Sequence, residues 1–315
     1  MTAIGIRAPA RGALDVVGIG VNAVDHLCTV EFFPTFDSKQ TLAGYDVQPG
    51  GQVATALVAL QRWGRRCRYV GTFGDGPLGA WSRRSLVDEG IEVAYAPTRG
   101  GVANQCAVIL VDRASGERTI LMHRPVALTL RPEEVDRGVV TGGRVLHLDG
   151  YDADAAHVAA SWARAAGVPV VVDVDTGVEE VERLLRLTDA VILACEFACA
   201  LTGAVDAEAA LGALAVMTGA PLVAVTLGAG GVIARTAAGT LRVPGFAVRA
   251  VDTTGAGDVF RAGFIHGLLA DWSLERTLAF ANAGAALKCT VAGGRPGIPT
   301  VAAAEALVAA RGIDA

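Results

Sequence analysis

Short runs of β-branched residues alternate with Ala- and Leu-rich segments of helical periodicity along most of this chain. Parallel strands cannot be joined by tight turns and need a crossover, which is usually a helix. The alternation therefore predicts an α/β fold: a three-layer α/β/α core with a mostly parallel sheet covered on both faces. The predicted strands are residues 15–20, 68–71, 145–148, 169–173, 190–193 and 221–226, and the predicted helices are 51–63, 78–89, 154–166, 206–218, 258–270 and 274–288.

Two segments, approximately 26–48 and 91–123, interrupt this alternation of strands and helices. They contain strand-like pieces with no helix between them, and Ala114-Ser-Gly-Glu117 has the composition of a hairpin turn. We expect the two segments to meet as a small antiparallel sheet that covers a cleft, because so small a sheet cannot bury both of its faces. The whole chain, residues 1–315, is then a single domain with a β-sheet lid inserted in the α/β core.

The composition excludes several classes of protein. With 52% hydrophobic residues and a net charge of −5, the chain is neither disordered nor basic, so we expect no nucleic-acid partner and no membrane surface. Residues 209–234 carry no charge over a length that could span a bilayer, but Gly219-Ala-Pro221 divides them into a helical half and a strand half. The six cysteines form no C-x-x-C pair, which is typical of a reduced, cytoplasmic protein.

The strongest local motif is Val251-Asp-Thr-Thr-Gly-Ala-Gly-Asp-Val-Phe260. The small residues Gly255, Ala256 and Gly257 stand where an extended segment enters an apolar helix, and free backbone amides at such a helix start bind anions. Asp258 follows in the first helical turn. Its carboxylate could cap the helix, or it could lie beside a bound phosphate and take the proton of an attacking hydroxyl group.

This motif resembles the C-terminal signature of the ribokinase (PfkB-type) sugar kinases. Gly50-Gly51 at the start of a helix and Gly71-Thr-Phe-Gly-Asp75 resemble the N-terminal signature of that family. Thr226-Leu-Gly-Ala-Gly-Gly231 and Gly293-Gly-Arg-Pro-Gly-Ile-Pro299 resemble further family segments. The motifs follow the order and spacing of the family over most of the chain.

The resemblance implies a ribokinase-like core with a β-sheet lid. It also implies transfer of the γ-phosphoryl group of ATP to a hydroxyl of a sugar, a ketose or a pentose, with Mg²⁺ bridging the nucleotide phosphates. Asp258 is then the catalytic base. The amides of Gly255, Ala256, Gly257 and Asp258 form the anion hole for the transferring group.

On the nucleotide side, the resemblance implies contacts from Thr226, Gly228 and Gly231, with Asn282 near the adenine. Glycines of ordinary turns and a solvated helix Asn are the structural alternatives. The N-x-x-E motif of the family, which lies near the metal, is not reproduced here. Glu196 stands one residue away from the matching position, where it either substitutes for the acidic residue of the motif or is an ordinary carboxylate at a helix start.

Family members often bind K⁺ through a loop beside the anion hole. Asp252, Thr254 and Gly293 match that loop and are the expected cation-binding residues. An Asp at the end of a strand is also a common turn former, so the match has an ordinary structural alternative.

On the acceptor side, Asp25 matches the family aspartate that binds sugar hydroxyls, and Gly50-Gly51 matches the glycines that let the sugar lie against the backbone. A carboxylate that accepts two hydroxyl donors suits a polyol. Thr55 replaces the usual Asn of the family, so the sugar contacts at that point must differ. Lys39 and Asn104 lie in the predicted lid, where they either face the cleft or form a solvated edge.

The acceptor and the activity keep alternatives open. Ala286-Leu-Lys-Cys-Thr290 is similar to the branch that contains ketohexokinase and sulfofructose kinase, and Lys39 would suit an anionic sugar. A nucleoside kinase of the same fold and an inactive sugar- or nucleotide-binding regulator are the two alternative functions. The exposed apolar face of a small sheet also predicts a homodimer formed through the lid sheets.

Overall fold

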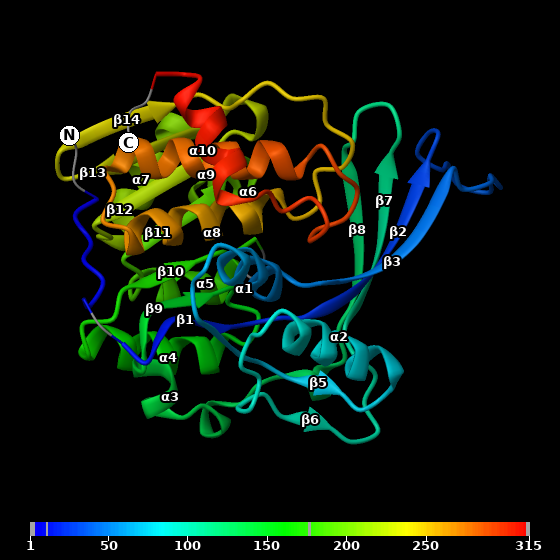
Figure 1. Ribbon diagram of the computed structural model, residues 1–315, viewed down its shortest axis with the longest axis horizontal. Helices are drawn as coiled ribbons and strands as arrows, with labels where there is room; N and C mark the ends of the chain where they lie inside the picture. Colours follow the sequence, from blue (N-terminus) through cyan, green and yellow to red (C-terminus); the bar gives the residue numbers. More distant parts are fainter. Residues whose placement is uncertain (1–3, 11, 176–177, 313–315) are drawn as a thin grey trace.

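The computed structural model describes residues 4–10, 12–175 and 178–312, so both ends of the predicted domain lie outside the described residues. Eight strands form one large sheet in the order β14-β13-β12-β11-β10-β9-β1-β4 (Figure 1). In that order, the strands are Gly239–Val243, Val232–Thr236, Leu222–Thr226, Ala190–Ala194, Val170–Val172, Gly143–Leu148, Leu14–Ile19 and Cys67–Val70.

The six strands from β4 to β12 pair in parallel, and the β13–β14 hairpin adds two antiparallel strands at one edge. The α/β fold class predicted from the sequence is confirmed. The edge hairpin was not among the predicted strands, because the sequence pattern of an edge strand carries a weaker hydrophobic signal than that of a buried central strand.

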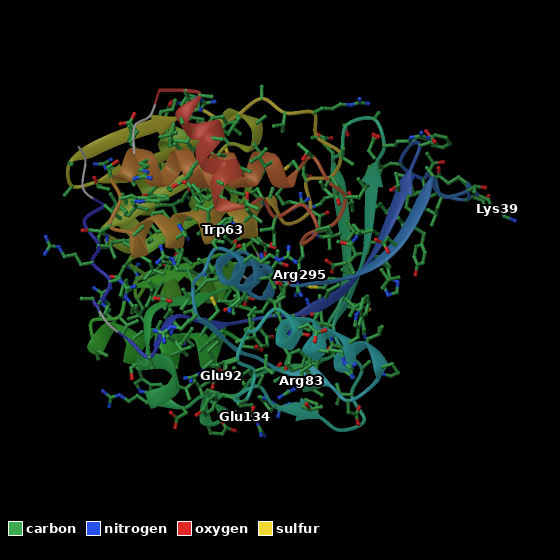
Figure 2. The ribbon with its side chains drawn as sticks, viewed as in Figure 1. Lys39, Trp63, Arg83, Glu92, Glu134 and Arg295 are labelled. Atoms are coloured by element: carbon green, nitrogen blue, oxygen red, sulfur yellow. The ribbon has the colours of Figure 1, made fainter. Side chains whose placement is uncertain are left out.

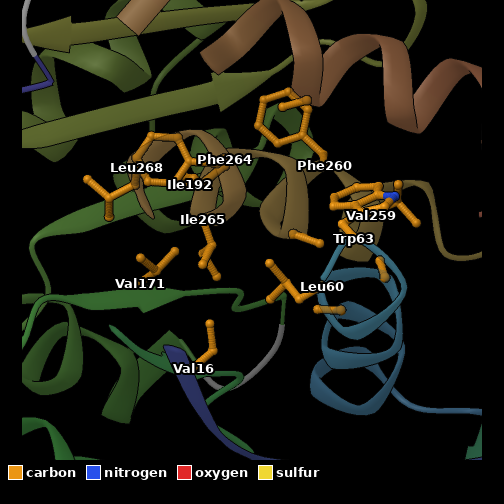
Figure 3. Close-up of a cluster of buried hydrophobic side chains, with 14 of the residues drawn as sticks. Val16, Leu60, Trp63, Val171, Ile192, Val259, Phe260, Phe264, Ile265 and Leu268 are labelled. Atoms are coloured by element: carbon orange, nitrogen blue, oxygen red, sulfur yellow. The ribbon is translucent and has the colours of Figure 1, made fainter. Parts of the chain in front are cut away.

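Helices cover both faces of the large sheet, because successive strand residues point to opposite sides. Ile192 packs with α1, α8, α9 and α10 on one face, whereas Val191 packs with α3, α4, α5 and α7 on the other. Figure 3 shows the first cluster, in which Leu60 and Trp63 of the α1 region meet side chains of α8. The helices are Gln52–Arg62 (α1), Pro77–Asp88 (α2), Arg137–Thr141 (α3), Ala153–Ala165 (α4), Val178–Leu185 (α5), Cys195–Thr202 (α6), Ala207–Thr218 (α7), Ala256–Leu269 (α8), Leu274–Lys288 (α9) and Val301–Ala309 (α10), with 3₁₀ turns at Val126–Leu128, Pro132–Glu134 and Gly228–Gly230.

A small sheet of four strands, in the order β3-β2-β7-β8, projects from one side of the core (Figure 1). Its strands are Gly44–Gly50 (β3), Ala23–Val30 (β2), Cys106–Asp112 (β7) and Arg118–His123 (β8). The central pair, β2 and β7, is parallel, so the expectation of an antiparallel sheet is wrong at this point. Both strands run outward from the core and each returns through its own hairpin, which makes the two outer pairs antiparallel and the central pair parallel.

Two further features complete the fold. A two-stranded parallel sheet joins Phe73–Gly74 (β5) to Thr98–Arg99 (β6). Within the described part of the chain, no single helix is long and apolar enough to cross a membrane, and one bent pair, Cys195–Thr202 with Ala207–Thr218, passes that test by length and composition only.

Candidate active site

The start of helix α8 is the segment predicted to bind an anion, and Gly255 caps it. Gly255 caps the helix with a φ of 79°, and a Cβ atom there would lie 2.8 Å from the Cα atom of Gly294, so this position requires glycine. With Gly255 as the cap, no side chain at that position competes for the free amides of the first turn. These amides and the helix dipole favour a bound anion.

Asp258 lies in the first turn of α8 and is half-buried. Burial raises the pKa of its carboxyl group well above the usual value, and the negative charges of Asp173 and Asp175 raise it further. Arg261 and Arg118 offset part of this effect. A carboxylate with a raised pKa binds a proton more firmly, which suits a base that must accept one from an alcohol.

Asp25 lies on β2 of the small sheet, close to Gly50. Its side chain on β2 is 7% exposed, and a Cβ atom on the neighbouring Gly50 would lie 1.9 Å from the Oδ2 atom of Asp25. Burial raises the pKa of Asp25 to about 6, Arg295 lowers it, and Asp252 raises it. No hydrogen bond to its carboxylate is recorded among residues 4–10, 12–175 and 178–312, so both oxygens remain available to a ligand.

Three of the residues predicted to bind the nucleotide lie at or just after the ends of the neighbouring strands β11 and β12. Thr226 ends β12 and pairs with Ala194, which caps α6, and Glu196 is exposed in the first turn of that helix. Gly228 begins the 3₁₀ turn after β12, with open space where a side chain would be. Thr226, Gly228 and Glu196 therefore share one edge of the sheet, where α/β folds bind their ligands.

Two other residues predicted to bind the nucleotide are held by the protein itself. A Cβ atom on Gly231 would lie 2.2 Å from the carbonyl oxygen of Val243, so this glycine serves a close backbone contact. The Asn282 amide donates to the carbonyl oxygens of Val243 (3.1 Å) and Pro244 (3.2 Å). Only the Oδ1 atom of Asn282 remains for a ligand.

Comparison with known proteins identifies the family to which this chain belongs. The family model "pfkB family carbohydrate kinase" matches residues 13–301. The chain belongs to this family. It is 28% identical to the ribokinase of Haemophilus influenzae over 92% of this chain and 96% of the relative. It is 32% identical to a fructokinase of Klebsiella pneumoniae over 80% of this chain and 89% of the relative.

Solved structures share the fold of this carbohydrate kinase. An adenosine kinase of Sinorhizobium meliloti superposes with a TM-score of 0.81 and 26% identity, covering 96% of this chain and 99% of the other. The ribokinase of Arabidopsis thaliana, solved with ribose and ATP, superposes with a TM-score of 0.80 and 23% identity, covering 94% and 99%. The core with its additional small sheet is therefore a ribokinase-like fold.

The small sheet of the kinase touches the loop that precedes α8. The backbone amide of Thr253 donates to the carbonyl oxygen of Gly116 in the β7–β8 turn over 3.2 Å. Arg118, at the start of β8, donates to the Oγ1 atom of Thr253 over 3.0 Å. The hairpin thus brings a guanidinium group beside the anion-binding loop, close enough to lower the pKa of Asp258.

A buried ion pair lies beneath Asp258. Arg261, one turn further along α8, is 3.0 Å from the Oδ1 atom of Asp173, and both side chains are at most 5% exposed. Arg261 also donates to the carbonyl oxygen of Ile192 over 2.9 Å. The pair ties α8 to the ends of β10 and β11 and fixes the direction in which the first turn of α8 presents Asp258.

The residues matched to the K⁺ loop do come together. The carboxylate of Asp252 accepts from the amides of Thr254 (2.8 Å) and Gly293 (2.7 Å). The carbonyl oxygen of Asp252 accepts from the ammonium group of Lys288 over 2.8 Å. The ammonium group of Lys288 is therefore bonded to the loop at which the resemblance implied a K⁺ ion.

Of the two lid residues, Lys39 follows the solvated-edge alternative, whereas Asn104 is bonded to other residues of the protein. Lys39 is exposed at the free end of the β2–β3 hairpin, far from Arg295 (Figure 2), because its charge remains solvated there. Asn104 is buried and fully hydrogen-bonded: it donates to Asn22 and to the Gln105 carbonyl, and it accepts from the amide of Gly74.

Thr55, which was also predicted on the acceptor side, is buried on α1. Its hydroxyl oxygen would be 3.8 Å from a Cβ atom on Gly294. Thr55 therefore lies behind the loop that packs against Gly255, at the junction of the acceptor and phosphate sides.

Several side chains of the site were not singled out from the sequence: Arg118, Asp173, Asp175, Arg261 and Lys288. Asp173 and Asp175 follow a predicted strand directly, and carboxylates at the carboxyl ends of parallel strands meet at one edge, so this signal was available. Arg261 stands three residues after Asp258 and therefore on the same helix face. The places of Arg118 and Lys288 beside the loop before α8 depend on how the small sheet and α9 pack, which the sequence does not reveal.

The donor set fits a Mg²⁺ ion that is held mainly by the nucleotide. Asp175 and Glu196 follow the adjacent strands β10 and β11 and offer carboxylate oxygens at the same edge. The described residues include no group of three or more His, Cys, Asp or Glu side chains arranged around a common metal position. Mg²⁺ bound to phosphates commonly uses only one or two protein carboxylates and keeps several waters.

Proposed function

We propose that this carbohydrate kinase transfers the γ-phosphoryl group of ATP to a hydroxyl group of a small sugar, a ketose or a pentose. The observation that carries the proposal is the pair of carboxylates, Asp25 and Asp258, whose oxygens accept no hydrogen bond from residues 4–10, 12–175 and 178–312. Asp25 accepts hydroxyl groups of the sugar and fixes its orientation. Asp258 accepts the proton of the hydroxyl group that reacts.

The reaction balances with these residues alone. The sugar oxygen forms a bond to the γ-phosphorus as Asp258 takes its proton, and the bond to the β,γ-bridging oxygen breaks to release ADP. The amides of Gly255, Gly257 and Asp258 donate to the oxygens of the transferring group, whereas the Ala256 amide already donates to the carbonyl oxygen of Thr253 over 3.2 Å. When bound, Mg²⁺ neutralises the phosphate charge, and Asp175 and Glu196 would hold it. K⁺ is not part of the proposal, because Lys288 already bonds to the loop assigned to it.

The small sheet is the proposed lid, and its outer face is the proposed dimer contact. Val108 and Leu121 are cross-strand partners, and Tyr45 lies on the same face. These three side chains are 38%, 57% and 60% exposed. Apolar side chains grouped in this way favour burial against a second copy of the chain. The use of ATP agrees with a cytoplasmic location.

The nucleoside-kinase alternative has less support. Tyr45 stacks on His26, on the face of the small sheet that does not carry Asp25. Phe36 is fully exposed in the loop between β2 and β3. ADP release should therefore be measured with ATP and Mg²⁺ across sugars, sugar acids and nucleosides, and turnover of nucleosides above all free sugars would reverse this preference.

Replacing Asp258 by Asn tests the proposed base directly. The change keeps the size of the side chain but removes the proton acceptor, so we expect the turnover rate to fall by roughly 10²–10⁴-fold. Binding of ATP, measured by calorimetry, should remain close to that of the wild type. Asp154→Asn is the matched control, since Asp154 is an exposed first-turn aspartate of α4. Undiminished turnover in Asp258→Asn would refute the role of this residue.

A further inference from the structure

Lys288 occupies an unusual position for a lysine. It ends helix α9, and its side chain is completely buried, with 0% exposure. The chain contains only two lysines, and the other, Lys39, is exposed at the tip of a hairpin. Because lysine is almost never fully buried without a partner, the environment of Lys288 must favour its charge.

The partner of the Lys288 ammonium is a backbone carbonyl group. Its Nζ atom donates to the carbonyl oxygen of Asp252 over 2.8 Å, and no ion pair to a carboxylate is recorded for it within the described ranges. Burial lowers the pKa of Lys288, whereas the negative charges of Asp252 and Asp258 raise it. The ammonium group therefore lies behind the loop that leads into the anion-binding turn at Gly255.

The oxygen atoms of Asp252 are already engaged by the protein. Both carboxylate oxygens of Asp252 already accept backbone amides, and its carbonyl oxygen accepts from Lys288. The Oγ1 atom of Thr254 is buried without a partner, but it is a single oxygen. Two like charges at van der Waals separation inside a protein repel each other strongly. A K⁺ ion bonded to the same carbonyl oxygen would experience this repulsion.

We propose that the Lys288 ammonium group is a built-in replacement for the monovalent cation, so that this kinase neither binds nor requires K⁺. Lys288 is a positioning residue: it holds the loop from Asp252 to Gly255 in the shape that directs the amides at the transferring phosphoryl group. The catalytic part of this inference rests on the proposed sugar kinase activity. The ion-binding part does not.

Thermal unfolding of the wild-type protein tests ion binding without any acceptor. The melting temperature should be the same in KCl, NaCl and choline chloride at equal ionic strength, because an ion that bound only the folded state would raise it. A rise that is specific to K⁺ would overturn the proposal, whether or not a sugar substrate is found. With an identified sugar, ADP formation should agree within about twofold among the three salts, and a larger K⁺ activation would also overturn it.

Three variants separate charge from volume at position 288. Lys288→Met fills the space without a charge, and we expect turnover to fall by about tenfold or more in every salt. Lys288→Ala leaves space for an ion, so its turnover and melting temperature should recover selectively in K⁺ or NH₄⁺. Lys39→Ala removes the exposed lysine and should behave as the wild type. Full activity of Lys288→Met in NaCl would contradict the role assigned to the ammonium group.

Discussion

Asp25 is the residue whose protonation state should control sugar binding. Its pKa is raised to about 6, so its carboxylate begins to protonate as the pH falls through that value. Protonation removes the negative charge and turns one carboxyl oxygen into a donor, so the group binds two hydroxyl donors less well than the carboxylate does. We therefore predict that the dissociation constant of the sugar rises about tenfold per pH unit below about 6. Calorimetry on Asp258→Asn measures this effect without turnover.

The matched control for this titration is the double variant Asp25→Asn with Asp258→Asn. Its weaker sugar binding should not change between pH 5 and 7, a range chosen to span the pKa of about 6 of Asp25. A pH dependence that persists in the double variant would assign the titration to another group.

The motifs of the sequence indicate which residues to examine, but they do not determine where distant side chains lie. The roles of Asp25, Gly50 and Asp258 stay predictions, and what the structure adds is the close approach of Gly50 to Asp25 and the place of Asp258 in the first turn of α8. The two alternatives for Lys39 could not be separated from the sequence, because nothing local determines which way a hairpin loop extends. The bonds of Asn104 could not be predicted, because its partners Asn22 and Gly74 come from distant parts of the chain.

At the scale of the secondary structure elements, the Asp173–Arg261 pair joins α8 to β10. Arg261→Ala would leave a buried carboxylate without a partner, so we predict a loss of about 3–5 kcal/mol in the free energy of unfolding. Urea denaturation measures this loss. Arg242→Ala removes an exposed partner of Glu208 and should cost less than about 1 kcal/mol. Equal losses in the two variants would show that burial of the pair does not matter.

Most elements could be predicted from periodicity, and the exceptions have physical causes. The central strands and the long helices agree with the predicted ranges within a few residues, because each buries a continuous apolar face. The short helices α3, α5 and α6 carry too few turns for a periodic signal. The parallel pairing of β2 with β7 depends on where both strands leave the core, which no local pattern records.

At the scale of the whole molecule, the outer face of the small sheet should determine the oligomeric state. We predict that the wild-type protein is a dimer by light scattering and that Leu121→Asp is a monomer, because a charge at this position cannot be buried between two apolar faces. Ile120→Asp is the control, since neighbouring residues of a strand point to opposite faces. A wild-type monomer at micromolar concentration, or dissociation by Ile120→Asp alone, would exclude this interface.

The contact between the β7–β8 turn and Thr253 also has a consequence for the hydrolysis of ATP in the absence of a sugar. The loop before α8 is bonded to the β7–β8 hairpin of the proposed lid, so outward movement of the small sheet would break the Gly116 and Arg118 contacts together. We therefore expect this kinase to hydrolyse little ATP while no sugar is bound, since closure of the proposed lid would be needed to complete the catalytic geometry.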